Sequence, residues 1–236
     1  MARTERLDAR YYPTAVDDHR LFEEAVRRHL RAEAVLLDAG AGRGVRYPYD
    51  YGEHVARVVG VDVSTNLSAN RLVHHPVRGD LARLPFRDAS FDLVFSKFVF
   101  EHLEQPLPTM RELRRVTRPG GHLVIHTPNR FHYVALGAML TPHNFHRWYN
   151  ARRGRSELDT FPTRYRANDR RRLQELAMRS GYRIERLDLV EPRPTYLDFH
   201  PFAYLLGIAY ERLVSRFEHL RGLRCVIVAD LLAVDR

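Results

Sequence analysis

The sequence has little cysteine, and it has no long apolar run. Cys225 is the single cysteine among 236 residues, so the chain can form neither an internal disulfide nor a cysteine-rich zinc site. The residue lies in an apolar segment, which favours a small buried side chain over a nucleophile. No stretch of about 18 apolar residues is present, and the N-terminus lacks the pattern of a signal peptide. We therefore expect a cytoplasmic protein with no integral membrane segment.

Lysine is nearly absent as well. Lys97 is the only one, and every other basic residue that contributes to the net charge of +9 is an arginine. Such a skew is typical of a genome rich in G and C. The arginines are spread along the chain with only short local runs, of which residues 170–172 are an example. The charge is consistent with an anionic partner, but this spacing does not favour nucleic acid.

A short apolar segment runs directly into a glycine-rich loop. Residues 35–39 read Val-Leu-Leu-Asp-Ala, and glycines follow at alternate positions, Gly40, Gly42 and Gly44. The dinucleotide-binding fingerprint needs its third glycine one residue later, where this chain has Val45. A nicotinamide-dependent dehydrogenase is therefore disfavoured.

A second apolar segment, residues 57–63, ends with Asp62 and Val63. An acid placed after a strand, a glycine turn and a helix can accept hydrogen bonds from the two hydroxyl groups of a ribose. The loop and this acid together predict a cofactor that contains adenosine.

The glycine loop and the acid that follows it resemble, in type and order, the motifs of the class I S-adenosylmethionine-dependent methyltransferases. The resemblance is to the branch that includes ubiquinone and menaquinone biosynthesis enzymes in particular. The resemblance covers residues 35–128. It is carried by the loop from Asp38 to Gly44, by Asp62, and by residues 78–96, 100–103 and 112–126. It implies S-adenosylmethionine as the cofactor.

The resemblance also implies roles for single residues. Asp38 would place negative charge near the cationic methionine end of the cofactor, and the glycines would allow close backbone approach. Asp80 would accept a hydrogen bond from the adenine amino group, while Leu81 packs against the ring. The predicted cofactor-binding residues are Asp38, Gly40, Gly42, Gly44, Asp62, Val63, Asp80, Leu81 and Ser96.

Apolar segments alternate with helical patterns along the whole chain. This alternation predicts an α/β fold of the Rossmann-like, doubly wound type, with a mostly parallel sheet and helices on both faces. The expected strands lie near residues 35–39, 57–63, 91–96, 122–127, 182–190 and 223–234, and the expected helices at 17–32, 105–117 and 169–180. Pro119-Gly-Gly121 reads as a turn before the fifth core strand.

We expect a single domain over residues 1–236. Its predicted parts are an N-terminal helical segment at 1–34, a cofactor-binding core at 35–128, a substrate lid inserted after the fifth strand at 130–168, and a C-terminal part at 169–236 with a helical insertion at 192–222. Ligands of doubly wound folds bind outside the carboxyl ends of the strands. The lid, which is rich in aromatic residues, is therefore placed to cover a substrate.

Methyl transfer from a sulfonium needs no metal to activate the leaving group, and we predict no metal site. A hydroxyl acceptor would benefit from a general base, and histidine is the usual choice near neutral pH. His143 and His146 are three residues apart in the lid, so a helical turn would put them on one face. They are the first and second candidates, and His102, after the fourth strand, is the third.

The leading hypothesis is O-methylation of a small-molecule hydroxyl on a sugar, glycolipid or natural product, because aromatic rings stack on such acceptors. Transfer to nitrogen or carbon stays open, since a fold alone does not separate these reactions. The net charge motivates an RNA methyltransferase as an alternative, although no appended RNA-binding module is evident. A non-catalytic protein that kept the fold is a further alternative. Residues 196–210 suggest peripheral membrane contact or an ordinary core helix, and the oligomeric state is not predicted.

Overall fold

The computed structural model describes residues 3–13, 17–44, 50–140 and 161–235. Segments that are far apart in the sequence build two compact units. The first unit consists of residues 1–18, 128–163 and 189–226, and the second of residues 19–127, 164–188 and 227–236.

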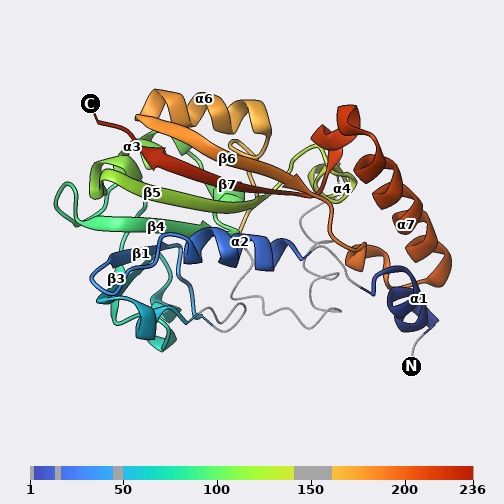
Figure 1. Ribbon diagram of the computed structural model, residues 1–236, viewed down its shortest axis with the longest axis horizontal. Coiled ribbons are helices and arrows are strands. Elements are labelled where there is room, and N and C mark those ends of the chain that lie inside the picture. Colours follow the sequence, from blue (N-terminus) through green and yellow to red (C-terminus); the bar gives the residue numbers. More distant parts are fainter. Residues whose placement is uncertain (1–2, 14–16, 45–49, 141–160, 236) are drawn as a thin grey trace. The chain divides into compact units, whose positions relative to one another are not determined.

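The second unit is built on a seven-stranded sheet with the strand order β3-β2-β1-β4-β5-β7-β6 (Figure 1). The strands are β1 (Val35–Ala39), β2 (Arg57–Asp62), β3 (His75–Arg78), β4 (Phe91–Lys97), β5 (Thr117–Pro128), β6 (Tyr182–Val190) and β7 (Val226–Ala233). The pairs β1–β2, β1–β4, β2–β3 and β4–β5 are all parallel. The predicted fold class, a Rossmann-like and mostly parallel sheet, is confirmed.

The central strands read as apolar runs because both of their faces are covered. In β1 the side chains of Leu36 and Leu37 are fully buried, and in β4 the same is true of Leu93 and Val94. The edge strand β3 is different, since none of its four residues is buried. A short polar strand has no hydrophobic period, and for that reason the sequence analysis did not predict it.

The structure corrects the expected start of the fifth core strand. Gly120 has the positive φ of a turn, +74°, as the Pro119-Gly-Gly121 pattern suggests. Nevertheless β5 begins before this turn, because Thr117 pairs with Phe91 and the register shifts before Leu93 pairs with His122. The glycines thus form an irregularity inside the strand rather than a boundary.

Three helices belong mainly to the second unit, α2 (Asp18–Arg27), α3 (Pro106–Val116) and α6 (Arg170–Ser180). Helix α2 is shorter than predicted, and it places Phe22 against Phe95 of β4 and His126 of β5. Helix α6 is capped at both ends, since the side chain of Asp169 accepts from the N–H of Arg172 and Gly181 adopts φ +85° after the last turn.

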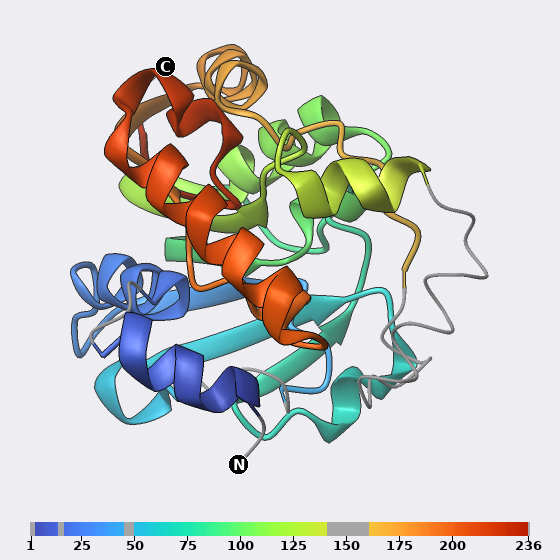
Figure 2. The same ribbon diagram turned by 90° about the vertical axis from the view of Figure 1, so that its right-hand side faces the viewer.

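The first unit contains the helices α1 (Arg3–Tyr11), α4 (Tyr133–Leu140) and α7 (Pro201–Arg216). Helices α1 and α7 lie side by side (Figure 2), and the hydroxyl of Tyr204 donates to the carboxylate of Asp8 between them. Helix α7 lies within residues 192–222, the range given for the predicted helical insertion. Among the described residues, no helix has the length and apolar character needed to cross a membrane.

Candidate cofactor site

The glycine loop leaves the carboxyl end of β1 with a backbone that requires glycine. Gly40, Gly42 and Gly44 all have positive φ, at +89°, +48° and +68°. A Cβ on Gly40 would lie 2.2 Å from a methyl carbon of Val99, so only glycine fits there. By contrast, among the residues that the structure describes, none apart from the two chain neighbours of Gly42 has an atom within 4 Å of its Cβ position. The middle of the loop therefore has an open face where a ligand can approach the backbone closely.

Asp62 joins the glycine loop to the end of β2. One carboxylate oxygen accepts from the backbone N–H of Gly42 at 2.9 Å, and the other accepts from the N–H of Ser64 at 2.8 Å. A carboxylate has about four lone-pair positions, so these two bonds leave capacity for further donors. The sequence thus placed an acid at the right strand end, and the structure adds that this acid fixes the loop itself.

Asn70 is a second support of the loop, and it was missed in the sequence. Its side-chain N–H donates to the carbonyl of Ala41 at 2.9 Å, and its carbonyl oxygen accepts from the N–H of Leu72 at 2.9 Å. The residue is 5% exposed. Because it bonds only to backbone atoms, which carry no residue identity, no sequence pattern points to it.

Asp38 lies on β1 just before the loop, and it is half-buried. Burial, together with the nearby charge of Asp62, raises the pKa of its carboxyl to about 7. The unliganded protein therefore holds this acid close to its point of half-ionisation at neutral pH. A cation at this position would favour the ionised form.

The remaining predicted cofactor residues are arranged around the ends of β2, β3 and β4. Asp80 is exposed, and its carboxylate accepts from the N–H of Ala82 at 2.9 Å. Leu81 is buried, whereas Val63 is 53% exposed. Ser96 is fully buried, and its hydroxyl donates to the carbonyl of Ala39 at 2.8 Å. This bond supports the start of the glycine loop, and contact of Ser96 with a cofactor stays a prediction.

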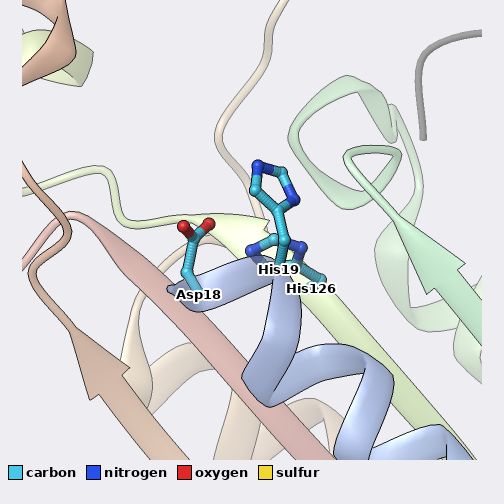
Figure 3. A group of neighbouring side chains, drawn as sticks. All are labelled: Asp18, His19 and His126. Carbon is cyan, nitrogen blue, oxygen red and sulfur yellow. The ribbon is translucent and has the colours of Figure 1, made fainter. Parts of the chain in front are cut away.

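A pair of histidines lies at the same edge of the sheet. Parallel pairing puts Asp38, Phe95 and Val124 in one row across three strands, and His126, two residues further along β5, pairs with Lys97 at the carboxyl end of β4. The ring of His19, on α2, meets the ring of His126 edge-on at a centroid distance of 5.4 Å. Figure 3 shows both rings, together with Asp18 at the start of α2. The sequence analysis did not select His19, because a histidine in a helix has no distinctive pattern.

The three predicted catalytic histidines have different outcomes. His102 lies in a short 3₁₀ helix (Phe100–His102) after β4, with its side chain 27% exposed and its Nε2 3.9 Å from a carboxylate oxygen of Glu101. Glu101 is itself buried and accepts from the hydroxyl of Thr127. His143 and His146 lie outside the described residues, so their roles remain predictions.

Comparison with known proteins identifies the core. Residues 37–125 match the family model described as a methyltransferase domain. This segment belongs to the class I S-adenosylmethionine-dependent methyltransferases. The match includes the glycine loop, Asp62 and Asp80, so these residues are part of the methyltransferase domain. The cofactor of such domains is S-adenosylmethionine.

Curated relatives agree on the domain but differ in what they act on. A protein of Mycolicibacterium smegmatis named as an S-adenosylmethionine-dependent methyltransferase is 40% identical over 107 residues, 43% of this chain and 41% of its own. Demethylmenaquinone methyltransferase of Beutenbergia cavernae is 38% identical over 38% of this chain and 39% of its own. The tRNA U34 carboxymethyltransferase of Shewanella denitrificans is 34% identical over 44% and 35%. Each match spans less than half of the relative's length.

A solved structure resembles the chain over nearly its whole length. It is the methyltransferase partner of the activator Trm112 from Haloferax volcanii, with a TM-score of 0.60 and 19% identity over 99% of this chain and 94% of that one. At this identity the likeness concerns the fold. It agrees with the order and the parallel pairing of the strands in the methyltransferase domain.

Proposed function

We propose that the chain transfers a methyl group from S-adenosylmethionine to a hydroxyl group of a small molecule, such as a sugar, glycolipid or natural product. The observation that carries the proposal is the geometry of the glycine loop. The open face at Gly42 adjoins Asp62, whose carboxylate is held by Gly42 and Ser64. A family match over residues 37–125 supports the cofactor.

The residues present fit an adenosine-bearing sulfonium cofactor. Asp62 has lone pairs left for ribose hydroxyls, and, apart from its two chain neighbours, no side chain of the described part of the chain lies within 4 Å of the Cβ position of Gly42. Asp38, whose pKa burial raises to about 7, favours a positively charged neighbour over a phosphate. We assign Asp38 to the methionine end, Asp62 to the ribose, and Asp80 with Leu81 to the adenine.

When bound, S-adenosylmethionine supplies an electrophilic methyl group on a sulfur that becomes neutral as the methyl leaves. The task of the chain is then to hold the acceptor oxygen in line with that carbon–sulfur bond, about 3 Å from the carbon. A histidine side chain would accept the hydroxyl proton as the new oxygen–carbon bond forms. No metal ligand is needed for this scheme.

Four histidines are candidates for that base. His143, His146 and His102 come from the sequence, and His19 joins them because its ring lies against that of His126 near the carboxyl end of β5. The test is the pH profile of methyl transfer in single alanine variants of the four. The variant of the true base should lose the acidic limb of the profile. Unchanged rates and profiles in all four would remove a histidine base from the proposal.

The first experiment is a calorimetric titration with S-adenosylhomocysteine, with NAD as the control. We expect micromolar binding of S-adenosylhomocysteine and no binding of NAD. An acceptor screen with hydroxylated sugars and phenols then tests the hydroxyl transfer, and labelled methyl groups on a nitrogen or carbon would instead support the alternative acceptors. No binding of either ligand by a folded sample would favour a non-catalytic protein.

A further inference from the structure

A second cluster of potential ligands lies within the second unit, away from the glycine loop. His29 follows α2, His122 lies on β5 and Asp230 lies on β7. The Nε2 of His29 is 2.8 Å from one carboxylate oxygen of Asp230, and the Nδ1 of His122 is 2.9 Å from the other. The carboxylate of Asp230 is thus hydrogen-bonded to two imidazoles.

The two imidazole rings are held unusually close together. They are stacked with centroids 3.6 Å apart and an angle of 20° between their planes. The side chains of His29, His122 and Asp230 are 19%, 15% and 8% exposed. Three groups that ligate metals therefore converge at a site that is largely, but not completely, shielded from water.

The position of His122 on β5 separates this cluster from the cofactor site. His122 pairs with Leu93, in the row of Leu36 near the start of β1. His126, at the other end of the same strand, is four residues away, which is about 13 Å along a strand. The cluster lies toward the amino ends of the strands, whereas the glycine loop lies at their carboxyl ends.

A pocket of about 140 Å³ opens beside the cluster. Both His29 and His122 line it, together with Arg31, Glu33, Asp92 and Arg118. A cavity of this kind needs about 10–15 Å³ to hold one water, so the pocket has room for water beside the two imidazoles. The histidine rings can therefore be reached from solvent.

We propose that His29, His122 and Asp230 bind a divalent transition metal, with zinc as the representative ion and water as the fourth ligand. Two imidazoles and one carboxylate are a common zinc ligand set. Zinc bonds of about 2.0 to 2.2 Å in a tetrahedron place neighbouring ligand atoms about 3.3 to 3.5 Å apart. One ligand atom from each of the three residues lies within 4.8 Å of the others. Because His29 and His122 now bond to different oxygens of Asp230, rotation of the carboxylate and of the imidazoles would have to bring one oxygen and both nitrogens to the tetrahedral spacing.

The two imidazoles can change from hydrogen-bond donors to metal ligands without losing a proton to solvent. Each neutral imidazole that now donates to the carboxylate moves its proton to its other ring nitrogen, which frees a lone pair for the ion. The ion would connect the turn after α2 to β5 and β7, three segments distant in sequence. Because the unfolded chain cannot present these ligands together, metal binding would stabilise the fold.

The test uses the full chain without an affinity tag, stripped of metal by a chelator. Zinc is titrated in a calorimeter, and cobalt is added as a spectroscopic probe whose absorption reports tetrahedral nitrogen and oxygen ligation. We expect one ion per chain and a melting temperature that rises with zinc. The variants His122→Gln and His29→Gln should each weaken binding at least tenfold. The exposed His75 on β3 offers the matched control His75→Gln, which should bind like the unaltered protein.

Two outcomes would overturn the proposal. The first is no zinc binding by the folded protein, in which case the cluster is only a hydrogen-bonded connection. The second is zinc binding that survives in His122→Gln but is lost in His19→Gln, which would put the ion beside His126. If the Asp230→Asn variant folds, its zinc affinity tests the third ligand. If it does not fold, the cobalt spectrum of His29→Gln is measured instead. None of these measurements depends on methyl transfer.

Discussion

At the scale of single residues, Asp62 supports the glycine loop and is proposed to bind the ribose, and two substitutions together separate these roles. Asp62→Ala removes the predicted acceptor for the ribose hydroxyls and also the bonds to Gly42 and Ser64. We expect S-adenosylmethionine binding to weaken by about 1 to 3 kcal/mol, measured by calorimetry. Asn70→Ala is the matched control, because it frees the loop but leaves Asp62 in place. Near-normal affinity in a folded Asp62→Ala protein would contradict the placement of the ribose.

Asp38 makes cofactor binding depend on pH. Burial raises its pKa to about 7 in the unliganded protein, and only the ionised carboxylate attracts a cation. We expect the affinity for S-adenosylmethionine to fall about tenfold from pH 8 to pH 6, because the ionised fraction falls by that factor. Asp38→Asn should bind weakly with a flat profile. A parallel slope in both proteins would show that another group titrates.

The raised pKa of Asp38 also predicts how the stability of the folded protein changes with pH. A carboxyl whose pKa is higher in the folded than in the unfolded chain binds more protons when folded. The stabilisation that the Asp38 carboxyl adds to the free energy of unfolding is complete below its pKa in the unfolded chain, near 3.8. It is lost as the pH rises through its pKa in the folded chain, about 7. Chemical denaturation of the unliganded protein should show that loss, and Asp38→Asn should not.

At the scale of elements, the glycine loop depends on close packing against the residues after β4. Gly40→Ala would place a Cβ 2.2 Å from Val99 at a φ of +89°. We expect a loss of about 2 to 4 kcal/mol of stability from the clash and the backbone strain together, measured by denaturant unfolding. Weaker cofactor binding should accompany it.

Two matched variants separate the clash from the strain. Gly120→Ala introduces the strain alone, at φ +74° with no atom within 4 Å of the new Cβ, and should cost about 1 to 2 kcal/mol with no change in cofactor affinity. Combining Gly40→Ala with Val99→Ala should recover part of the lost stability. Equal losses in Gly40→Ala and Gly120→Ala would mean that Val99 moves freely out of the way.

Elements with a strong hydrophobic period were predictable, and those held by backbone contacts were not. The runs in β1 and β4 are visible as residue types, so their places followed from the sequence. Strand β3 has no buried residue to give it a period. In the site, Asp62 was visible through its spacing, whereas Asn70 acts on carbonyl groups that any residue could supply. The cluster at Asp230 joins three distant segments, and spacing along the chain cannot show that.

At the scale of the whole molecule, the net charge of +9 predicts general attraction to polyanions. The salt dependence of RNA binding and the methylation of RNA distinguish that attraction from a dedicated RNA substrate. Charge spread over many arginines binds RNA through released counterions, so three phosphate contacts would give roughly a twenty- to forty-fold loss of affinity between 50 and 200 mM salt. We expect that loss and no methyl transfer to the RNA. Fluorescence anisotropy measures the binding, and incorporation of a labelled methyl group measures the reaction.

A charge variant provides the control for that experiment. Arg170 and Arg171 at the start of α6 are exposed, and replacing both with glutamine should weaken RNA binding at low salt while S-adenosylmethionine affinity stays the same. A hydroxyl acceptor, by contrast, should be methylated at the same rate by both proteins, because a neutral small molecule has no phosphates to attract. Labelled methyl groups on RNA that persist at high salt would make RNA the acceptor, and the hydroxyl proposal would then fail while the assignment of the cofactor stands.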